Sequence, residues 1–221
     1  MTTLNAETLT LRDVHRLLGL QMQLNGSFTP LLSLEPLTEF EQQELVQIKD
    51  DFANYLTAAK VSEGLVKALT TFPLMRLVGF YRFPIEIQLE EGIERITIED
   101  EDTIITGRFD ILAINQTAPG GSKPFWVLVI ESKNSSIDLS AGLPQLLTYA
   151  FKSFAYQESV WGLVTNGLRY QFVYLRQATP PTYQLMPDLN LFETERAIQL
   201  LQVLKAICKL EISDSSSSDV A

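Results

Sequence analysis

The fold prediction starts from one segment, Pro124-Phe125-Trp126-Val127-Leu128-Val129-Ile130-Glu131-Ser132-Lys133. Almost every residue before Glu131 is apolar, as in a central strand that is buried on both faces of a sheet. Because side chains alternate along a strand, Glu131 and Lys133 share one face while Ser132 points to the other. Charges at the end of a buried strand are costly unless they are paired, solvated or bound to metal. We therefore expect the chemistry of this chain to lie at this strand end.

The preceding strand is predicted over Thr103–Asn115 and is rich in isoleucine. Pro119-Gly120-Gly121 mark the turn between the two strands. A turn centred between the two glycines pairs residues whose numbers sum to 241, so Asp110 faces Glu131. Like charges opposite each other destabilise a strand pair, and two such carboxylates resist joint ionisation. A divalent cation would remove that penalty, and oxygen ligands favour Mg²⁺ or Mn²⁺ over zinc.

The rest of the chain predicts an α/β fold, a mixed β-sheet flanked by helices. Alternating residues indicate strands at 82–89, 95–99, 160–165 and 169–175, and helical spacing indicates helices after Thr10, Thr38 and Ser62, from Leu143, and at 193–210. Pro73 is expected to stop or bend the helix that begins at Ser62. We divide the chain into an N-terminal helical extension at 1–60, an α/β core at 61–212 and a disordered tail at 213–221.

Charge is unevenly distributed along the 221 residues, whose formal net charge is −10. The segment Glu86–Asp102 alone carries −7, which leaves −3 for the remainder, and we expect it to be a solvated acidic hairpin. The net charge argues against a general nucleic-acid coat but not against a local DNA-binding face. The single cysteine, Cys208, is expected to be a core thiol. No secretory signal or membrane-spanning stretch is visible, so a cytoplasmic protein is expected.

Several catalytic motifs are missing from the sequence. It has no GxxxxGK[ST] loop, so a nucleotide-driven motor or a specificity subunit would have to be another chain. It has no HExxH motif and no CxxC pair, and one histidine with one cysteine gives poor support for zinc or Ser-His chemistry. The remaining candidate is an acidic site with one lysine.

At these residues the chain resembles the PD-(D/E)XK nuclease superfamily, which has a restriction-endonuclease-like fold. In that family an aspartate ends one strand, and an acidic residue, any residue and a lysine follow on the next, as do Asp110 and Glu131-Ser132-Lys133 here. Phe109 replaces the proline of the family name. Gln145-x-x-x-Tyr149 and the segment 160–167, which ends in Thr-Asn-Gly, are similar to the N-terminal nuclease domains of type I restriction subunits. The resemblance covers 62–175, roughly half of the chain.

The resemblance implies a Mg²⁺-dependent DNA endonuclease, with Mn²⁺ as an alternative cofactor and a homodimer left open. The implied catalytic residues are Asp110, Glu131, Lys133 and Gln145. The implied metal ligands are Asp110, Glu131, Ser132 and Glu63, which precedes the sheet. Tyr149 and Lys152 are the expected substrate contacts, because Gln145, Tyr149 and Lys152 share one helix face.

Each of these assignments has a structural alternative. Asp110 with Lys133 could form an ion pair without catalysis, and Glu63 could serve only the helix dipole at its N-terminus. Gln145 and Tyr149 could be a surface amide and a ring at the core edge, and Arg108 a surface charge rather than a phosphate clamp. The chain as a whole could be a catalytically silent nuclease-fold module that binds DNA or a protein. The complete Asp, Glu and Lys set favours the active enzyme.

Overall fold

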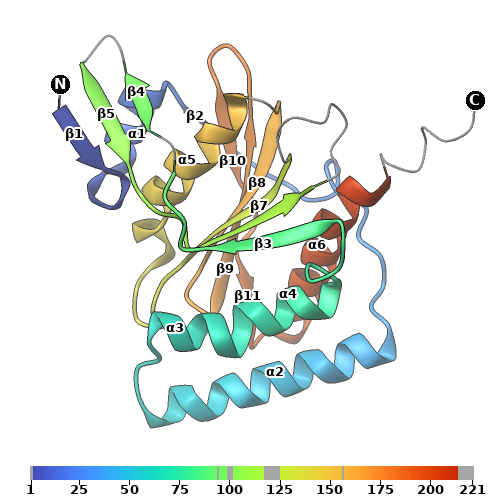
Figure 1. Ribbon diagram of the computed structural model, residues 1–221. Helices are drawn as coiled ribbons and strands as arrows, with labels where there is room; N and C mark the ends of the chain where they lie inside the picture. The colour runs from blue at the N-terminus through green and yellow to red at the C-terminus, as the bar shows by residue number, and fades with distance from the viewer. Residues whose placement is uncertain (1, 94, 99–101, 117–124, 156, 214–221) are drawn as a thin grey trace, which may run out of the picture.

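The computed structural model describes residues 2–93, 95–98, 102–116, 125–155 and 157–213. An eight-stranded mixed sheet is covered by helices on both faces, and a smaller three-stranded sheet lies at one end (Figure 1). The predicted α/β class, a mixed sheet flanked by helices, is therefore confirmed. None of the helices in the described ranges is long and apolar enough to cross a membrane.

The large sheet has the order β2-β10-β9-β8-β7-β6-β3, with β11 paired to β9. The strands β7 and β8 are parallel, as are β2 and β10, whereas the other pairs are antiparallel. The small sheet has the order β1-β5-β4. The strands are β1 Thr2–Asn5, β2 Gln21–Gln23, β3 Ile85–Leu89, β4 Ile96–Ile98, β5 Thr103–Thr106, β6 Ile111–Asn115, β7 Phe125–Ser132, β8 Ser159–Thr165, β9 Arg169–Arg176, β10 Thr182–Leu185 and β11 Leu189–Asn190.

Helices form a layer on each face of the large sheet (Figure 1). Side chains of α2, α4 and α6 join one apolar core with Ile111 and Ile130, while α1 and α5 join a second core with Leu112 and Val129. Alternate residues of β6 and β7 therefore serve opposite faces, as a doubly covered sheet requires. The helical segments are η1 Ala6–Thr8, α1 Leu11–Leu18, α2 Glu39–Ala58, α3 Glu63–Val66, η2 Lys67–Thr71, α4 Phe72–Val78, η4 Leu139–Ala141, α5 Leu143–Phe151, η5 Lys152–Ala155 and α6 Thr194–Ser213.

The predicted register between β6 and β7 is confirmed near the candidate site. Ile111 pairs with Ile130, and the next two pairs also follow the sum of 241. The register then shifts between Ala113 and Ile114, where β7 carries one extra residue, Val127. The turn that motivated the prediction falls within 117–124, outside the described residues. The pairs beside the turn sum to 240, so the extra residue in β7 is what restores the predicted sum of 241 at the acidic strand ends.

Two expectations for the acidic region were wrong. The segment 103–115 is not one strand, because β5 belongs to the small sheet and β6 to the large one. The acidic run is not one hairpin, because β3 pairs with β6 while β4 pairs with β5. The break falls at Gly107, where a Cβ atom would come within 2.8 Å of the Tyr149 ring, so the chain passes close against α5. Period-two alternation is the same in both sheets and does not reveal such a break.

The N-terminal 60 residues are not purely helical. They contribute β1 to the small sheet and β2 to the edge of the large one. The helix caps at Thr10, Thr38 and Ser62 are confirmed, the first two as full capping boxes. Cys208 is confirmed as a core residue, and burial raises the pKa of its thiol to about 11. The tail predicted at 213–221 lies outside the described residues, except for Ser213 at the end of α6.

Pro73 was predicted to stop or bend the helix that begins after Ser62; the helix continues through Pro73 to Val78, so it is not stopped there. Instead, a π-helical turn, η2, occupies Lys67–Thr71 immediately before it. A proline cannot donate to the carbonyl four residues earlier, and a π turn is one way in which a helix absorbs such an interruption. The π turn begins at Lys67, a residue that proves central to the candidate site.

Candidate active site

Two carboxylates lie at the neighbouring ends of β6 and β7. Asp110 directly precedes β6, and Glu131 is the penultimate residue of β7. Asp110 and Glu131 directly flank the last pair of the ladder, Ile111 with Ile130. Asp110 is tied to the opposite strand because its Oδ2 accepts a hydrogen bond of 2.7 Å from the backbone N–H of Ser132. The sequence prediction that these two acids meet is therefore confirmed.

Glu131 and Lys133 form an ion pair inside the protein. The Lys133 Nζ donates to Glu131 Oε1 at 2.5 Å and to Gln145 Oε1 of α5 at 3.2 Å. Glu131 is only 1% exposed, and its second oxygen, Oε2, is buried without a hydrogen-bond partner. A buried carboxylate oxygen without a donor is costly, so Oε2 is the one atom of this group that still requires a partner.

Burial dominates the electrostatics of Glu131. Removal from water raises the pKa of Glu131 to about 8, and the neighbouring Asp110 carboxylate adds to the rise while Lys133 opposes it. Burial also acts against the charge of Lys133, but the adjacent Glu131 carboxylate outweighs it, so the pKa of Lys133 is raised. The site therefore holds Lys133 charged and gives Glu131 a strong preference for a positive neighbour.

A second lysine, Lys67 of η2, lies among the acids. Its Nζ is 3.4 Å from Asp110 Oδ1, 3.3 Å from Glu63 Oε1 and 3.5 Å from Glu90 Oε1. Burial acts against the charge of Lys67, but Asp110 and then Glu63 outweigh it, so its pKa is raised. Sequence reasoning missed Lys67 and Glu90. The signal for Lys67 was its i, i+4 spacing from Glu63, whereas Glu90 was hidden in the acidic run.

Gln145 and Tyr149 form a buried chain of hydrogen bonds that links α5 to the strand ends. Gln145 Nε2 donates to the Tyr149 hydroxyl at 2.9 Å, and the backbone N–H of Arg108 donates to the same hydroxyl at 3.1 Å. Tyr149 is 0% exposed, so its expected role as a direct substrate contact is not supported. It is a positioning residue. Its hydroxyl fixes the Gln145 side chain beside Lys133 and holds the backbone at Arg108, two residues before Asp110.

Removing the Tyr149 hydroxyl should therefore weaken the fold. In Tyr149→Phe, the Gln145 amide and the Arg108 N–H both lose an acceptor, which typically costs about 1–3 kcal/mol for buried groups. Urea unfolding followed by circular dichroism measures the loss. Tyr55→Phe removes the same hydroxyl from an exposed ring of α2 and should change stability little. Equal stability of Tyr149→Phe and wild type would contradict the positioning role.

The remaining predicted residues lie at different distances from the cluster. The Ser132 side chain is buried and, by strand alternation, faces away from Glu131, so only its backbone is placed near the acids. Arg108 is exposed, as a surface charge would be. Lys152 lies in η5, seven residues beyond Gln145, which corresponds to about 10 Å along a helix axis. The structure thus brings together Asp110, Glu131, Lys133, Gln145 and Glu63, but not Lys152.

No protein-family model matches this chain, and no curated protein is similar to it in sequence.

The acidic cluster suits a cation that needs few protein ligands. No three His, Cys, Asp or Glu side chains among the described residues converge closely enough to form a ready-made metal cage. Mg²⁺ does not require one, because it keeps several waters and commonly binds through one or two carboxylates. The Oε2 of Glu131 has no partner, and the Asp110 carboxylate is close enough to Glu131 to raise its pKa, so the two groups offer hard oxygen ligands. The residues present therefore fit Mg²⁺ or Mn²⁺ better than a fully protein-ligated metal.

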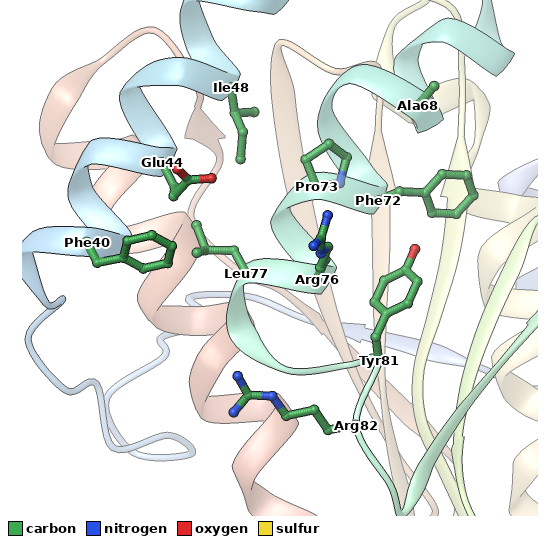
Figure 2. A pocket seen from close by; sticks show the side chains of 10 residues that line it. All are labelled: Phe40, Glu44, Ile48, Ala68, Phe72, Pro73, Arg76, Leu77, Tyr81 and Arg82. Atoms are coloured by element: carbon green, nitrogen blue, oxygen red, sulfur yellow. The ribbon is translucent and has the colours of Figure 1, made fainter.

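A separate pocket of about 520 Å³ lies between α2 and α4, away from the acidic cluster. Figure 2 shows side chains of α2 and α4 facing each other across it. It is lined by Phe40, Glu44, Ile48, Ala68, Phe72, Pro73, Arg76, Leu77, Tyr81 and Arg82. None of the predicted site residues lines it. Its lining combines aromatic and aliphatic side chains with two arginines and one glutamate, and it is separate from the candidate active site.

Proposed function

We propose that this protein is a Mg²⁺-dependent phosphodiesterase that hydrolyses DNA as an endonuclease. The observation that carries the proposal is the buried Glu131 carboxylate, which has one oxygen paired to Lys133 and the other without a partner, and whose pKa is raised further by the nearby Asp110. This arrangement combines two hard oxygen ligands with a fixed ammonium group at one end of two strands. The resemblance of the motif to PD-(D/E)XK nucleases gives the reaction class.

The residues divide into two roles. Asp110 and Glu131 would hold the cation, with the Ser132 backbone and Glu63 beside them; bound there, Mg²⁺ or Mn²⁺ lowers the pKa of a water and neutralises phosphate charge. Lys133 presents a charged ammonium at a position set by Glu131 and Gln145. A preorganised cation of this kind stabilises the negative charge that develops on a phosphate in the transition state.

DNA binding by a chain of net charge −10 requires positive charge close to the site, because the exposed carboxylates of Glu63 and Glu90 lie there too. Lys133, at the end of β7, supplies a positive charge at the site itself. Lys152 remains a predicted phosphate contact, which would have to engage DNA further along α5. A homodimer would let two such sites act on two strands.

A catalytically silent module that binds DNA or a protein is the second candidate. Lys67 favours it, because an ammonium already satisfies Asp110 without a metal. The pocket between α2 and α4 favours it too, since Phe40 and Tyr81 are exposed there beside Arg76 and Arg82. Such a surface would suit a partner carrying acidic and aromatic groups. The intact Lys133 and the unpartnered Glu131 oxygen favour the enzyme.

A nuclease assay tests the proposal directly. Supercoiled, linear and single-stranded DNA would be incubated with the protein in Mg²⁺, in Mn²⁺ and in EDTA. We expect cleavage with either metal and none in EDTA, since the reaction depends on the cation. Cleavage that persists in EDTA would exclude this mechanism. DNA retention in a gel-shift assay without cleavage under any metal would support the silent module.

A further inference from the structure

Lys67 is shared by three carboxylates from three parts of the chain. Glu63 lies one helical turn before it, Glu90 follows β3, and Asp110 precedes β6. The Lys67 side chain is only 10% exposed, whereas those of Glu63 and Glu90 are 41% and 61% exposed. Two of its partners therefore lie toward solvent, and the third, Asp110, lies inward. The Lys67 ammonium group therefore lies between the inward Asp110 carboxylate and the two solvent-exposed carboxylates.

Asp110 has no oxygen without a partner. Its Oδ1 faces the Lys67 ammonium, and its Oδ2 accepts the Ser132 N–H. Glu131 differs, because Lys133 occupies Oε1 while Oε2 has no hydrogen-bond partner. A cation that approaches both carboxylates therefore meets a free oxygen on Glu131 but an ammonium group on Asp110. Two positive charges at such short separation repel strongly in a partly buried site.

From this geometry we infer that Lys67 is the resident counter-ion of Asp110, and that a divalent cation binds only by displacing it outward toward Glu63 and Glu90. The inference rests on the proposed function, since it concerns the same metal site and adds how that site is regulated. The exposed carboxylates keep Lys67 paired after it leaves Asp110. Lys67 thus lowers the affinity of the site for the cation and stabilises the metal-free protein.

The test compares Mg²⁺ binding with and without the ammonium. Lys67→Met keeps an unbranched apolar stem one atom shorter than lysine and removes the charge, and Lys60→Met removes the same charge from an exposed position on the surface. Titration calorimetry with Mg²⁺ alone, without DNA, gives the Kd of each protein. We expect Lys67→Met to bind Mg²⁺ about tenfold more tightly or better, within the usual range of coupling between bound ligands. Lys60→Met should match the wild type.

The outcomes separate the inference from the proposed function. Equal or weaker Mg²⁺ binding by Lys67→Met would overturn the counter-ion role and leave the metal site standing. No binding by any of the proteins would overturn the metal site itself, and the inference with it.

A measurement on the wild type avoids dependence on a variant that folds poorly. Amine acylation, mapped by mass spectrometry, should label Lys67 slowly without metal and several times faster in saturating Mg²⁺, with Lys60 as the internal reference. A Lys67 labelling rate that Mg²⁺ leaves unchanged or lowers would also overturn the displacement.

Discussion

Lys133→Met should reduce DNA cleavage about 100- to 1000-fold while leaving Mg²⁺ binding largely intact. The variant removes the only feature of Lys133 that the proposed reaction uses, its ammonium, and keeps the apolar stem. Loss of one preorganised electrostatic group in an active site typically has an effect of about this size. Single-turnover cleavage rates in Mg²⁺ measure it, and calorimetric titration with Mg²⁺ verifies that the metal site persists.

The position of Lys133 explains why the effect should be specific to catalysis. Its Nζ is held from two sides, by Glu131 on its own strand and by Gln145 of α5. Lys60→Met changes the net charge equally and should cleave at the wild-type rate. Equal cleavage by Lys133→Met and wild type would reduce Lys133 to a structural partner of Glu131, which is the non-catalytic ion-pair interpretation of the motif.

The sequence predicted the neighbouring positions of Asp110 and Glu131, but not the reason for them. The assumed turn centre gives a sum of 241, whereas the pairs beside the turn sum to 240, and an extra residue in β7 restores 241 toward the site. Charge neutralisation was not predictable in the same way. The register argument predicted that a metal neutralises the two carboxylates. In the structure, Lys133 pairs with Glu131 and Lys67 pairs with Asp110. Lys67 reaches Asp110 only because η2 packs beside the sheet, and this placement depends on tertiary structure.

The role of Tyr149 was also beyond sequence reasoning. Helical spacing correctly put it on the same face as Gln145, but spacing does not say which neighbour covers that face. The backbone at Gly107 approaches the Tyr149 ring closely and buries it. That approach in turn depends on the break between β5 and β6, which the alternation pattern concealed. One missed break therefore accounts for both the wrong strand and the unexpected burial of Tyr149.

The metal-free protein should lose stability as the pH rises from about 5.5 to 8, and Glu131→Gln should remove most of that loss. Glu131 has its ordinary pKa of 4.5 when unfolded and a pKa of about 8 when folded, chiefly because of burial. Between these values the folded state holds a proton that the unfolded state has lost. Stability therefore falls with rising pH, by at most about 1.4 kcal/mol per pH unit for one such proton.

The pH window isolates this group from the other perturbed acids. Asp13, Glu35, Glu41 and Asp138 have lowered pKa values, so their stabilising contributions are complete once the pH exceeds the ordinary carboxyl range. Lys67 and Lys133 have raised pKa values, and they lose their protons only at higher pH. Urea unfolding in EDTA at pH 5.5, 7 and 8.5 should show the wild-type and Glu131→Gln stabilities diverging, with the variant more stable at pH 8.5. If the two free energies of unfolding instead change in parallel with pH, Lys133 fully compensates the burial of an ionised Glu131. The site then has no uncompensated negative charge for a cation to bind.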